Sequence, residues 1–121
     1  MLWRTLKNVP GRFRRASGFS ARGLKAAFLG EESFRLEILG LALLGAVLLA
    51  VPWPLWKKAA LAAAYLLIPA TELLNSALED LADLVSPDFH PLVEKAKNKG
   101  SAAVLLAIVA NIICLGALIL A

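Results

Sequence analysis

The sequence predicts an all-α membrane protein, in which an N-terminal amphipathic surface helix precedes three transmembrane helices. Of its 121 residues, 60% are hydrophobic and 18% are charged. An average soluble domain is closer to half apolar and a quarter charged, so the composition places the chain in a membrane class. The chain is also too short for two domains. We expect one helical bundle over residues 1–121, with membrane helices at about 33–56, 59–85 and 93–121.

The first 30 residues are basic and carry no acid. Apolar and aromatic side chains recur among the basic ones, a pattern typical of a helix that lies in the membrane interface. Pro10 and Gly11 are expected to break this helix into two pieces. A basic segment favours an anionic partner, either a membrane surface or phosphate, and nucleic acid is not expected for so apolar a chain. The basic residues are Arg4, Lys7, Arg12, Arg14, Arg15, Arg22 and Lys25.

Two apolar runs follow this segment, and a helix needs about 20 residues to cross the ~30 Å hydrocarbon core of a bilayer. The first run, residues 36–51, reaches this length only if it takes in residues 52–56. Two Trp residues there suit a membrane interface, and two Pro residues suit a turn. The second run starts near Ala59 and continues to about Val85, with a local distortion expected at Pro69.

A loop at residues 86–91, with a Pro near each end, separates the second run from the third. The chain resumes a helix at Leu92 and is apolar from Ala102 onward. Asn111 is the one strongly polar residue of this run, and we expect its amide to bond within or between helices, with a lipid ester as the alternative. The single Cys114 excludes an internal disulfide and a cysteine-based zinc site.

Three spans place the two termini on opposite sides of the membrane. The basic N-terminal segment and the lysine-rich segment 95–99 lie on one side, which the positive-inside rule makes the cytoplasm. Lys57 then lies outside. The acidic helix ends, at residues 31–37 and 72–83, therefore converge at the cytoplasmic interface.

The most informative stretch follows the apolar start of the second run. At about 100° per residue, Glu72, Asn75, Glu79 and Asp83 fall on one face of a helix. A carboxylate next to an apolar run costs roughly 2.5–3.5 kcal/mol on insertion scales, so it usually faces a cavity or a partner. The simpler interpretation is a helix that leaves the membrane with a solvated side. The amide and hydroxyl side chains among these acids favour a functional site instead.

Carboxylates near Lys and Arg at a membrane surface suit phosphoryl transfer from a nucleotide. Mg²⁺ takes one or two carboxylates together with phosphate oxygens, and a further carboxylate can deprotonate a hydroxyl. Glu72 and Glu79 lie about 10 Å apart along a helix axis, which suits a base and a metal ligand at the two ends of a phosphate. The chain lacks the glycine motifs of P-loop and protein-kinase sites. From the residues alone, a proton-coupled transporter subunit stays open as an alternative.

Four motifs resemble the small integral-membrane bacterial diacylglycerol kinase family. They are Gly23-Leu24-Lys25-Ala26-Ala27-Phe28, Glu31 with Ser33-Phe34-Arg35-Leu36-Glu37, Glu72-Leu73-Leu74-Asn75-Ser76-Ala77-Leu78-Glu79, and Lys95-Ala96-Lys97-Asn98-Lys99-Gly100-Ser101-Ala102-Ala103-Val104. They follow the family's order and spacing from about Arg12 to the end of the chain, and the last two are the most specific. The resemblance implies a kinase that uses ATP and Mg²⁺ in the bacterial inner membrane. It also implies a homotrimer whose active sites are shared between subunits.

The resemblance further implies a role for each site residue. Glu72 is the catalytic base on the lipid hydroxyl, and Glu31 and Glu79 hold the magnesium that carries the ATP phosphates. Asn75 supports the site. The other ATP contacts are Arg12, Phe19, Asp88, His90, Lys97 and Asn98. The lipid substrate is contacted by Arg12, Ser33, Arg35, Glu37, Glu72 and Ser101.

One position departs from the family pattern, and the lipid has two candidates. The family usually has Asp where this chain has Asn98, whose amide carries no charge. The loop 86–91 looks like the undecaprenol kinase branch of the family, whereas Glu37 and the segment 100–103 look like the diacylglycerol branch. We expect diacylglycerol, which would be converted to phosphatidic acid.

Overall fold

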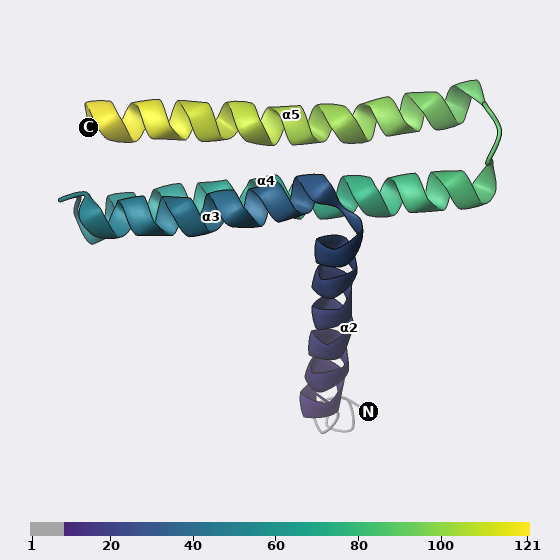
Figure 1. Cartoon of the computed structure of the whole chain (residues 1–121), viewed down its shortest axis with the longest axis horizontal. Helices are drawn as coiled ribbons and strands as arrows, with labels where there is room; N and C mark the ends of the chain where they lie inside the picture. The colour runs from purple at the N-terminus through teal and green to yellow at the C-terminus, as the bar shows by residue number, and fades with distance from the viewer. Residues whose placement is uncertain (1–8) are drawn as a thin grey trace. The chain divides into compact units, whose positions relative to one another are not determined.

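A computed structural model describes residues 9–121, and every regular element in that range is a helix (Figure 1). The elements are α2 (Val9–Gly30), α3 (Glu32–Ala50), α4 (Leu55–Val85) and α5 (Pro91–Leu120). The chain divides into two compact units, Met1–Arg35 and Leu36–Ala121. The predicted all-α fold, with an N-terminal helix ahead of three long apolar helices, is confirmed.

Helix α2 forms most of the described part of the first unit. Within the described residues it runs from Val9, with Pro10 and Gly11 in its first turn. Proline is tolerated there because the first turn has no intrahelical partner for its backbone nitrogen. The separate piece predicted ahead of Pro10 falls on residues 1–8, which lie outside the described residues. Large apolar side chains along α2 are exposed, including Phe13 and Phe19, as expected for a helix that lies in a membrane interface.

The C-terminal end of α2 is capped by the residues that follow it. The last carbonyls of a helix have no intrahelical donor, so they need other partners. The Glu31 backbone N–H donates to the Ala27 carbonyl at 2.8 Å. The Arg35 guanidinium donates to the carbonyls of Phe28 at 3.0 Å and Leu29 at 3.2 Å. A cation at this end also suits the helix dipole, so Arg35 has a structural role beside its predicted contact with lipid.

Helix α3 is shorter than the membrane helix predicted at residues 33–56. It ends at Ala50, while Trp56 lies in the first turn of α4. The reason is Pro52, because a residue that precedes proline avoids the helical conformation. The 19 residues of α3 still extend about 28 Å at 1.5 Å per residue, close to the thickness of the hydrocarbon core.

Helix α4 is unbroken over 31 residues and contains Pro69. Proline cannot donate its backbone hydrogen bond, and its ring usually kinks or breaks a helix interior. The predicted distortion at Pro69 does not interrupt the helix. The Thr71 hydroxyl donates to the carbonyls of Leu67 and Ile68, both at 2.9 Å, and so supports the turn around the proline. The polar face that begins at Glu72 therefore continues the same helix as the apolar first half.

Helices α4 and α5 run side by side in opposite directions and are joined by the loop 86–90 (Figure 1). The Asn111 amide donates to the Ala64 carbonyl of α4 at 2.8 Å and to the Ala107 carbonyl of its own helix at 2.9 Å. This confirms the predicted bonding within and between helices. At the far end, Lys57 donates to the Leu118 carbonyl at 2.9 Å, which satisfies a C-terminal carbonyl of α5.

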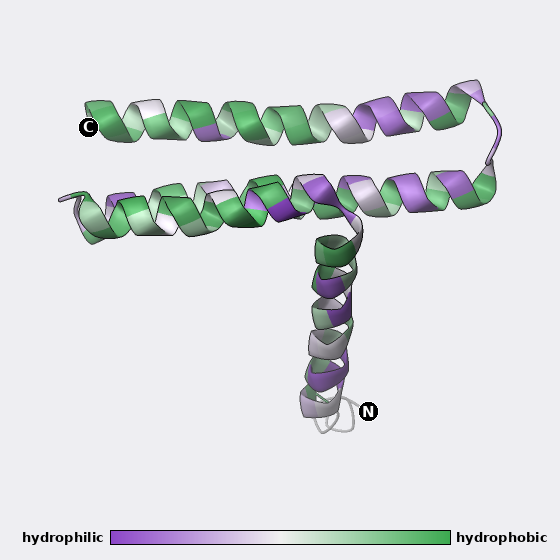
Figure 2. Ribbon diagram, in the orientation of Figure 1, coloured by the Kyte–Doolittle hydropathy of each residue, from purple (hydrophilic) through white to green (hydrophobic). Residues whose placement is uncertain are grey.

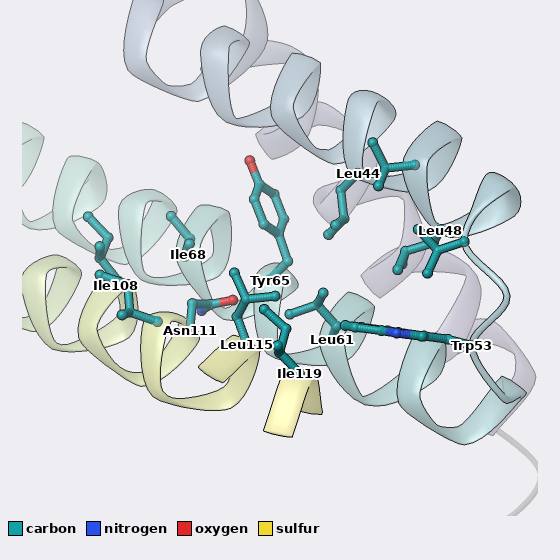
Figure 3. Close-up of a pocket in the computed structure, with 13 residues that line it drawn as sticks. Leu44, Leu48, Trp53, Leu61, Tyr65, Ile68, Ile108, Asn111, Leu115 and Ile119 are labelled. Atoms are coloured by element: carbon teal, nitrogen blue, oxygen red, sulfur yellow. The ribbon is translucent and has the colours of Figure 1, made fainter. Parts of the chain in front are cut away.

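A small apolar core joins α3, α4 and α5. Leu48, Leu61 and Leu118 are buried at its centre. Beside it, the three helices and the α3–α4 turn line an almost wholly apolar cavity of about 520 Å³, whose few polar side chains are Trp53, Tyr65 and Asn111 (Figure 3). The Tyr65 hydroxyl donates to the Glu37 carbonyl at 2.8 Å and so ties α4 to α3.

Most large apolar side chains of these helices are exposed, and apolar residues cover most of the ribbon (Figure 2). Helices α3, α4 and α5 are each long and apolar enough to cross a membrane. So much exposed apolar surface is incompatible with water on all sides. The chain is therefore a membrane protein.

Candidate active site

Polar residues gather in the halves of α4 and α5 that adjoin the connecting loop, while the other halves are apolar (Figure 2). Because α4 is a continuous helix, Glu72, Asn75, Glu79 and Asp83 lie on one face of it, as predicted. Glu72 and Asn75 are half-buried, whereas Glu79 and Asp83 are exposed. This polar face thus leads from a protected end at Glu72, next to the apolar half of α4, to an open end near the loop.

Two members of the polar face contact each other. The Asn75 amide nitrogen donates to one Glu79 carboxylate oxygen (Oε1) at 3.3 Å. An amide that holds a carboxylate in this way restricts its rotation and leaves the second oxygen for another partner. Asn75 was predicted only to support the site. Its hydrogen bond to Glu79 is a contact through which it can do so.

Lys97 of α5 reaches the open end of the polar face. Its ammonium forms an ion pair with the Asp83 carboxylate, with a nitrogen–oxygen distance of 2.6 Å. The helical period predicted that Asp83 lies on this face, but no partner was predicted for its carboxylate. The two side chains are 37% and 65% exposed, and an ion pair this open to solvent contributes little to stability. A phosphate group can therefore replace Asp83 as the partner of Lys97 at little cost in free energy.

The loop between α4 and α5 closes a hollow of about 300 Å³ at the same end. His90 immediately precedes α5, and its imidazole Nδ1 accepts the Leu92 backbone N–H at 3.2 Å. This contact is an N-terminal cap, so His90 shapes the loop as well as lining the hollow. Four residues predicted to contact ATP line this hollow together: Asp88, His90, Lys97 and Asn98.

The first unit holds the remaining basic candidates. A hollow of about 440 Å³ along α2 is lined by arginines and by Phe19, over whose ring the Arg22 guanidinium lies at 4.8 Å. Arg12, the predicted phosphate contact, is not among its lining residues. The arginines that line it are Arg14, Arg15 and Arg22, members of the basic segment for which an anionic membrane surface or phosphate was predicted as the partner.

The other candidates lie on α3, on α5 and at the residue between α2 and α3. Glu31 occupies the single residue between α2 and α3, and Ser33 is exposed in the first turn of α3. Glu37 is half-buried farther along α3, and Ser101 is exposed on α5. Glu31, Ser33 and Arg35 belong to the first unit, and the other site residues of α3, α4 and α5 belong to the second.

The donor set suits magnesium that arrives with a nucleotide. Within residues 9–121, no three His, Cys, Asp or Glu side chains come close enough together to hold a metal ion by themselves. Mg²⁺ does not need such a group, because it binds through one or two carboxylates and takes its other ligands from phosphates and water. Glu79, already oriented by Asn75, fits that requirement.

Comparison with known proteins gives a consistent result. The family described as prokaryotic diacylglycerol kinase matches residues 18–120. The chain is 39% identical to diacylglycerol kinase of Escherichia coli (strain K12) over 108 residues, which cover 84% of each chain. It is 43% identical to diacylglycerol kinase of Pseudomonas aeruginosa over 101 residues, covering 80% of this chain and 79% of that one. For diacylglycerol kinase of Haemophilus influenzae the identity is 35% over 94 residues, with coverage of 74% and 76%.

The helices and the polar face of α4 define a small membrane protein in which a polar face adjoins the apolar spans. The chain belongs to the prokaryotic diacylglycerol kinase family. The resemblance stated from the motifs is therefore confirmed. The matched region takes in every predicted site residue except Arg12.

Proposed function

We propose that the protein is a lipid kinase that transfers the γ-phosphate of ATP to diacylglycerol and so forms phosphatidic acid. The observation that carries this proposal is the polar face of α4, which runs from half-buried Glu72 to the open end beside Lys97. A lipid hydroxyl arrives from the bilayer and a nucleotide arrives from water. A site for both has to lie at the boundary between them. The change from an apolar to a polar half along α4 supports such a position (Figure 2).

Glu72 is proposed as the general base. The diacylglycerol hydroxyl oxygen attacks the γ-phosphorus, and the bond from that phosphorus to the oxygen bridging the β-phosphorus breaks. ADP leaves with the electron pair, and the hydroxyl proton passes to the Glu72 carboxylate. The half-buried position of Glu72, next to the apolar half of α4, supports this role because a lipid hydroxyl would approach from the apolar side.

The nucleotide is proposed to bind at the open end. Bound Mg²⁺ would neutralise charge on the phosphates, and the family resemblance assigns it to Glu31 and Glu79. Lys97, with its replaceable Asp83 partner, supports a phosphate contact. The hollow at the α4–α5 loop supports nucleotide contacts by Asp88, His90 and Asn98. Arg12 and Phe19 complete the proposed ATP contacts. The proposed lipid contacts, besides Glu72 and Arg12, are Ser33, Arg35, Glu37 and Ser101.

A homotrimer with shared active sites is part of the proposal, as is an inner-membrane location with a cytoplasmic N-terminus. Buried side chains are few in the described chain, and long apolar stretches of α3, α4 and α5 stay exposed. Packing against further copies would cover part of this surface. The basic N-terminal segment and the lysines near Lys97 support the orientation through the positive-inside rule.

The test is incubation of the purified protein in neutral detergent with labelled ATP, Mg²⁺ and one lipid at a time. We expect label in phosphatidic acid when diacylglycerol is supplied, and none with the Glu72→Gln variant. Label in undecaprenol phosphate alone would instead assign the protein to the undecaprenol kinase branch of the family. Label in no lipid, together with proton-linked flux in vesicles, would contradict the kinase assignment and favour a transporter.

A further inference from the structure

Helix α5 lies close against the polar face of α4 at Gly100. A Cβ atom built on Gly100 would overlap the Asn75 side-chain oxygen (Oδ1) and would lie 3.1 Å from a Leu78 methyl carbon and 3.3 Å from the Asn75 Cγ. Even the smallest side chain would therefore have to displace the Asn75 amide. Gly116, on the same helix, has nothing within 4 Å of its corresponding position. On α5, glycine is therefore required at position 100 but not at position 116.

The orientation of the Asn75 amide follows from its two neighbours. A carboxylate can only accept hydrogen bonds, so the amide has to turn its nitrogen toward Glu79, to which it donates at 3.3 Å. This turns Oδ1 the other way, where it is buried and has no hydrogen-bond partner in the described chain. The position that a Cβ atom of residue 100 would take lies directly against Oδ1, so this oxygen occupies space that glycine leaves free.

We infer that Gly100 is a positioning residue, whose missing side chain makes the space in which Asn75 holds the Glu79 carboxylate. The inference rests on the proposed function, because it assigns this arrangement to the phosphoryl-transfer site. Any side chain at position 100 pushes the amide out of this space and so releases Glu79. Neighbours of this kind, which orient a metal ligand without binding the metal, typically change metal affinity or activity by roughly 10–100-fold when they are altered.

The first experiment observes the amide itself. Isotope-labelled full-length protein in detergent micelles gives a side-chain NH₂ signal for Asn75, assigned by its loss in the Asn75→Ala variant. We expect Gly100→Ala to shift this signal and Gly116→Ala to leave it in place. An unchanged signal in Gly100→Ala would overturn the inference, since the amide would then not have moved.

The second experiment measures turnover and the Mg²⁺ concentration for half-maximal rate. Gly100→Ala should lower kcat and raise the Mg²⁺ concentration for half-maximal rate, and the two changes combined should amount to about 10-fold or more. Gly116→Ala should change neither quantity. In an Asn75→Ala background, Gly100→Ala should add less than about twofold, because residues that act through one contact are not additive. A full additional loss in that background would overturn the inference.

Two further outcomes remain decisive. If Gly100→Ala fails to fold, the Asn75→Ala/Gly100→Ala double variant should recover a folded protein, and its failure would mean that Gly100 serves something other than Asn75. If the wild-type protein phosphorylates no lipid, the proposed function fails. A shifted Asn75 signal in Gly100→Ala would then show only a packing contact, and the positioning role would fail with the function.

Discussion

Two side chains of α4 occupy space that a neighbouring glycine leaves empty. Asn75 lies against Gly100 of α5, and the Tyr65 hydroxyl lies against Gly40 of α3, where a Cβ atom would overlap that hydroxyl. In both places a polar group of α4 reaches the backbone of another helix. Such contacts between helices in a membrane depend on small residues, because apolar side chains gain little by leaving lipid for each other.

Gly40→Ala should therefore destabilise the protein. Adding a methylene to a packed contact typically costs about 1–3 kcal/mol in unfolding free energy. We expect a lower melting temperature in detergent for Gly40→Ala and little change for Gly45→Ala, because Gly45 on the same helix has nothing within 4 Å. Tyr65→Phe removes the nearest atom, so the double variant should lose less than the sum of the single variants. Equal melting temperatures for the Gly40 and Gly45 variants would contradict this account.

Glu72→Gln should nearly abolish turnover while nucleotide binding stays intact. The substitution keeps the shape of the side chain but removes the proton acceptor, and general-base assistance is typically worth about 10²–10⁴-fold. Steady-state rates with saturating lipid and ATP measure the loss, and nucleotide binding measured separately serves as the control. A Gln variant that retains more than about a tenth of the rate would exclude Glu72 as the base.

At the scale of elements, the helices were more predictable than their ends. Hydrophobic run lengths predicted α3, α4 and α5 in order, and the loop prolines predicted the end of α4 near Val85. The end of α3 was placed too late because Trp53 and Trp56 prolong the apolar run, whereas the backbone of Pro52 ends the helix at Ala50. For the end of α3, the apolar composition and the backbone of proline predict different boundaries. The helix ends where the proline backbone requires.

Helix α2 allows a direct contact to be separated from general attraction to the membrane. Arg12→Ala should lower turnover even in neutral detergent with saturating lipid, because a direct contact with phosphate does not require an anionic surface. Lys25→Ala, on the same helix, should lose activity only in vesicles of anionic lipid. That loss should vanish at high salt, because attraction to a charged surface is screened. Identical turnover of the two variants in neutral detergent would contradict a direct contact between Arg12 and phosphate.

At the scale of the whole molecule, the sequence predicted which residues share a face but not what they touch. A helical period places Glu72, Asn75, Glu79 and Asp83 together without any knowledge of α5. The contacts of Lys97 with Asp83 and of Asn75 with Gly100 depend on how α5 is shifted along α4, and no local pattern encodes that shift. The family motif does contain Gly100, so the signal was present, but its physical reason appears only once the helices are packed.

The proposed magnesium site also depends on residues that lie far apart in the sequence. Glu79→Gln should raise the Mg²⁺ concentration needed for half-maximal rate, because a neutral amide is a weaker ligand than a carboxylate. Asp80→Asn, which changes the exposed neighbouring acid, should leave it unchanged. The double variant of Glu79→Gln with Glu31→Gln should lose far less than the sum if both side chains serve one ion. Additive losses with an unchanged magnesium requirement would argue against a shared metal.

The measurement that tests the central claim most directly is the phosphorus balance of the reaction. Phosphorus NMR of the protein in micelles with ATP, Mg²⁺ and diacylglycerol follows each phosphate group through the reaction. We predict that the γ-phosphate signal of ATP is replaced, one for one, by ADP and the phosphomonoester of phosphatidic acid. ADP that accumulates with inorganic phosphate and no phosphorylated lipid, or ATP that is not consumed, would contradict transfer to the lipid hydroxyl.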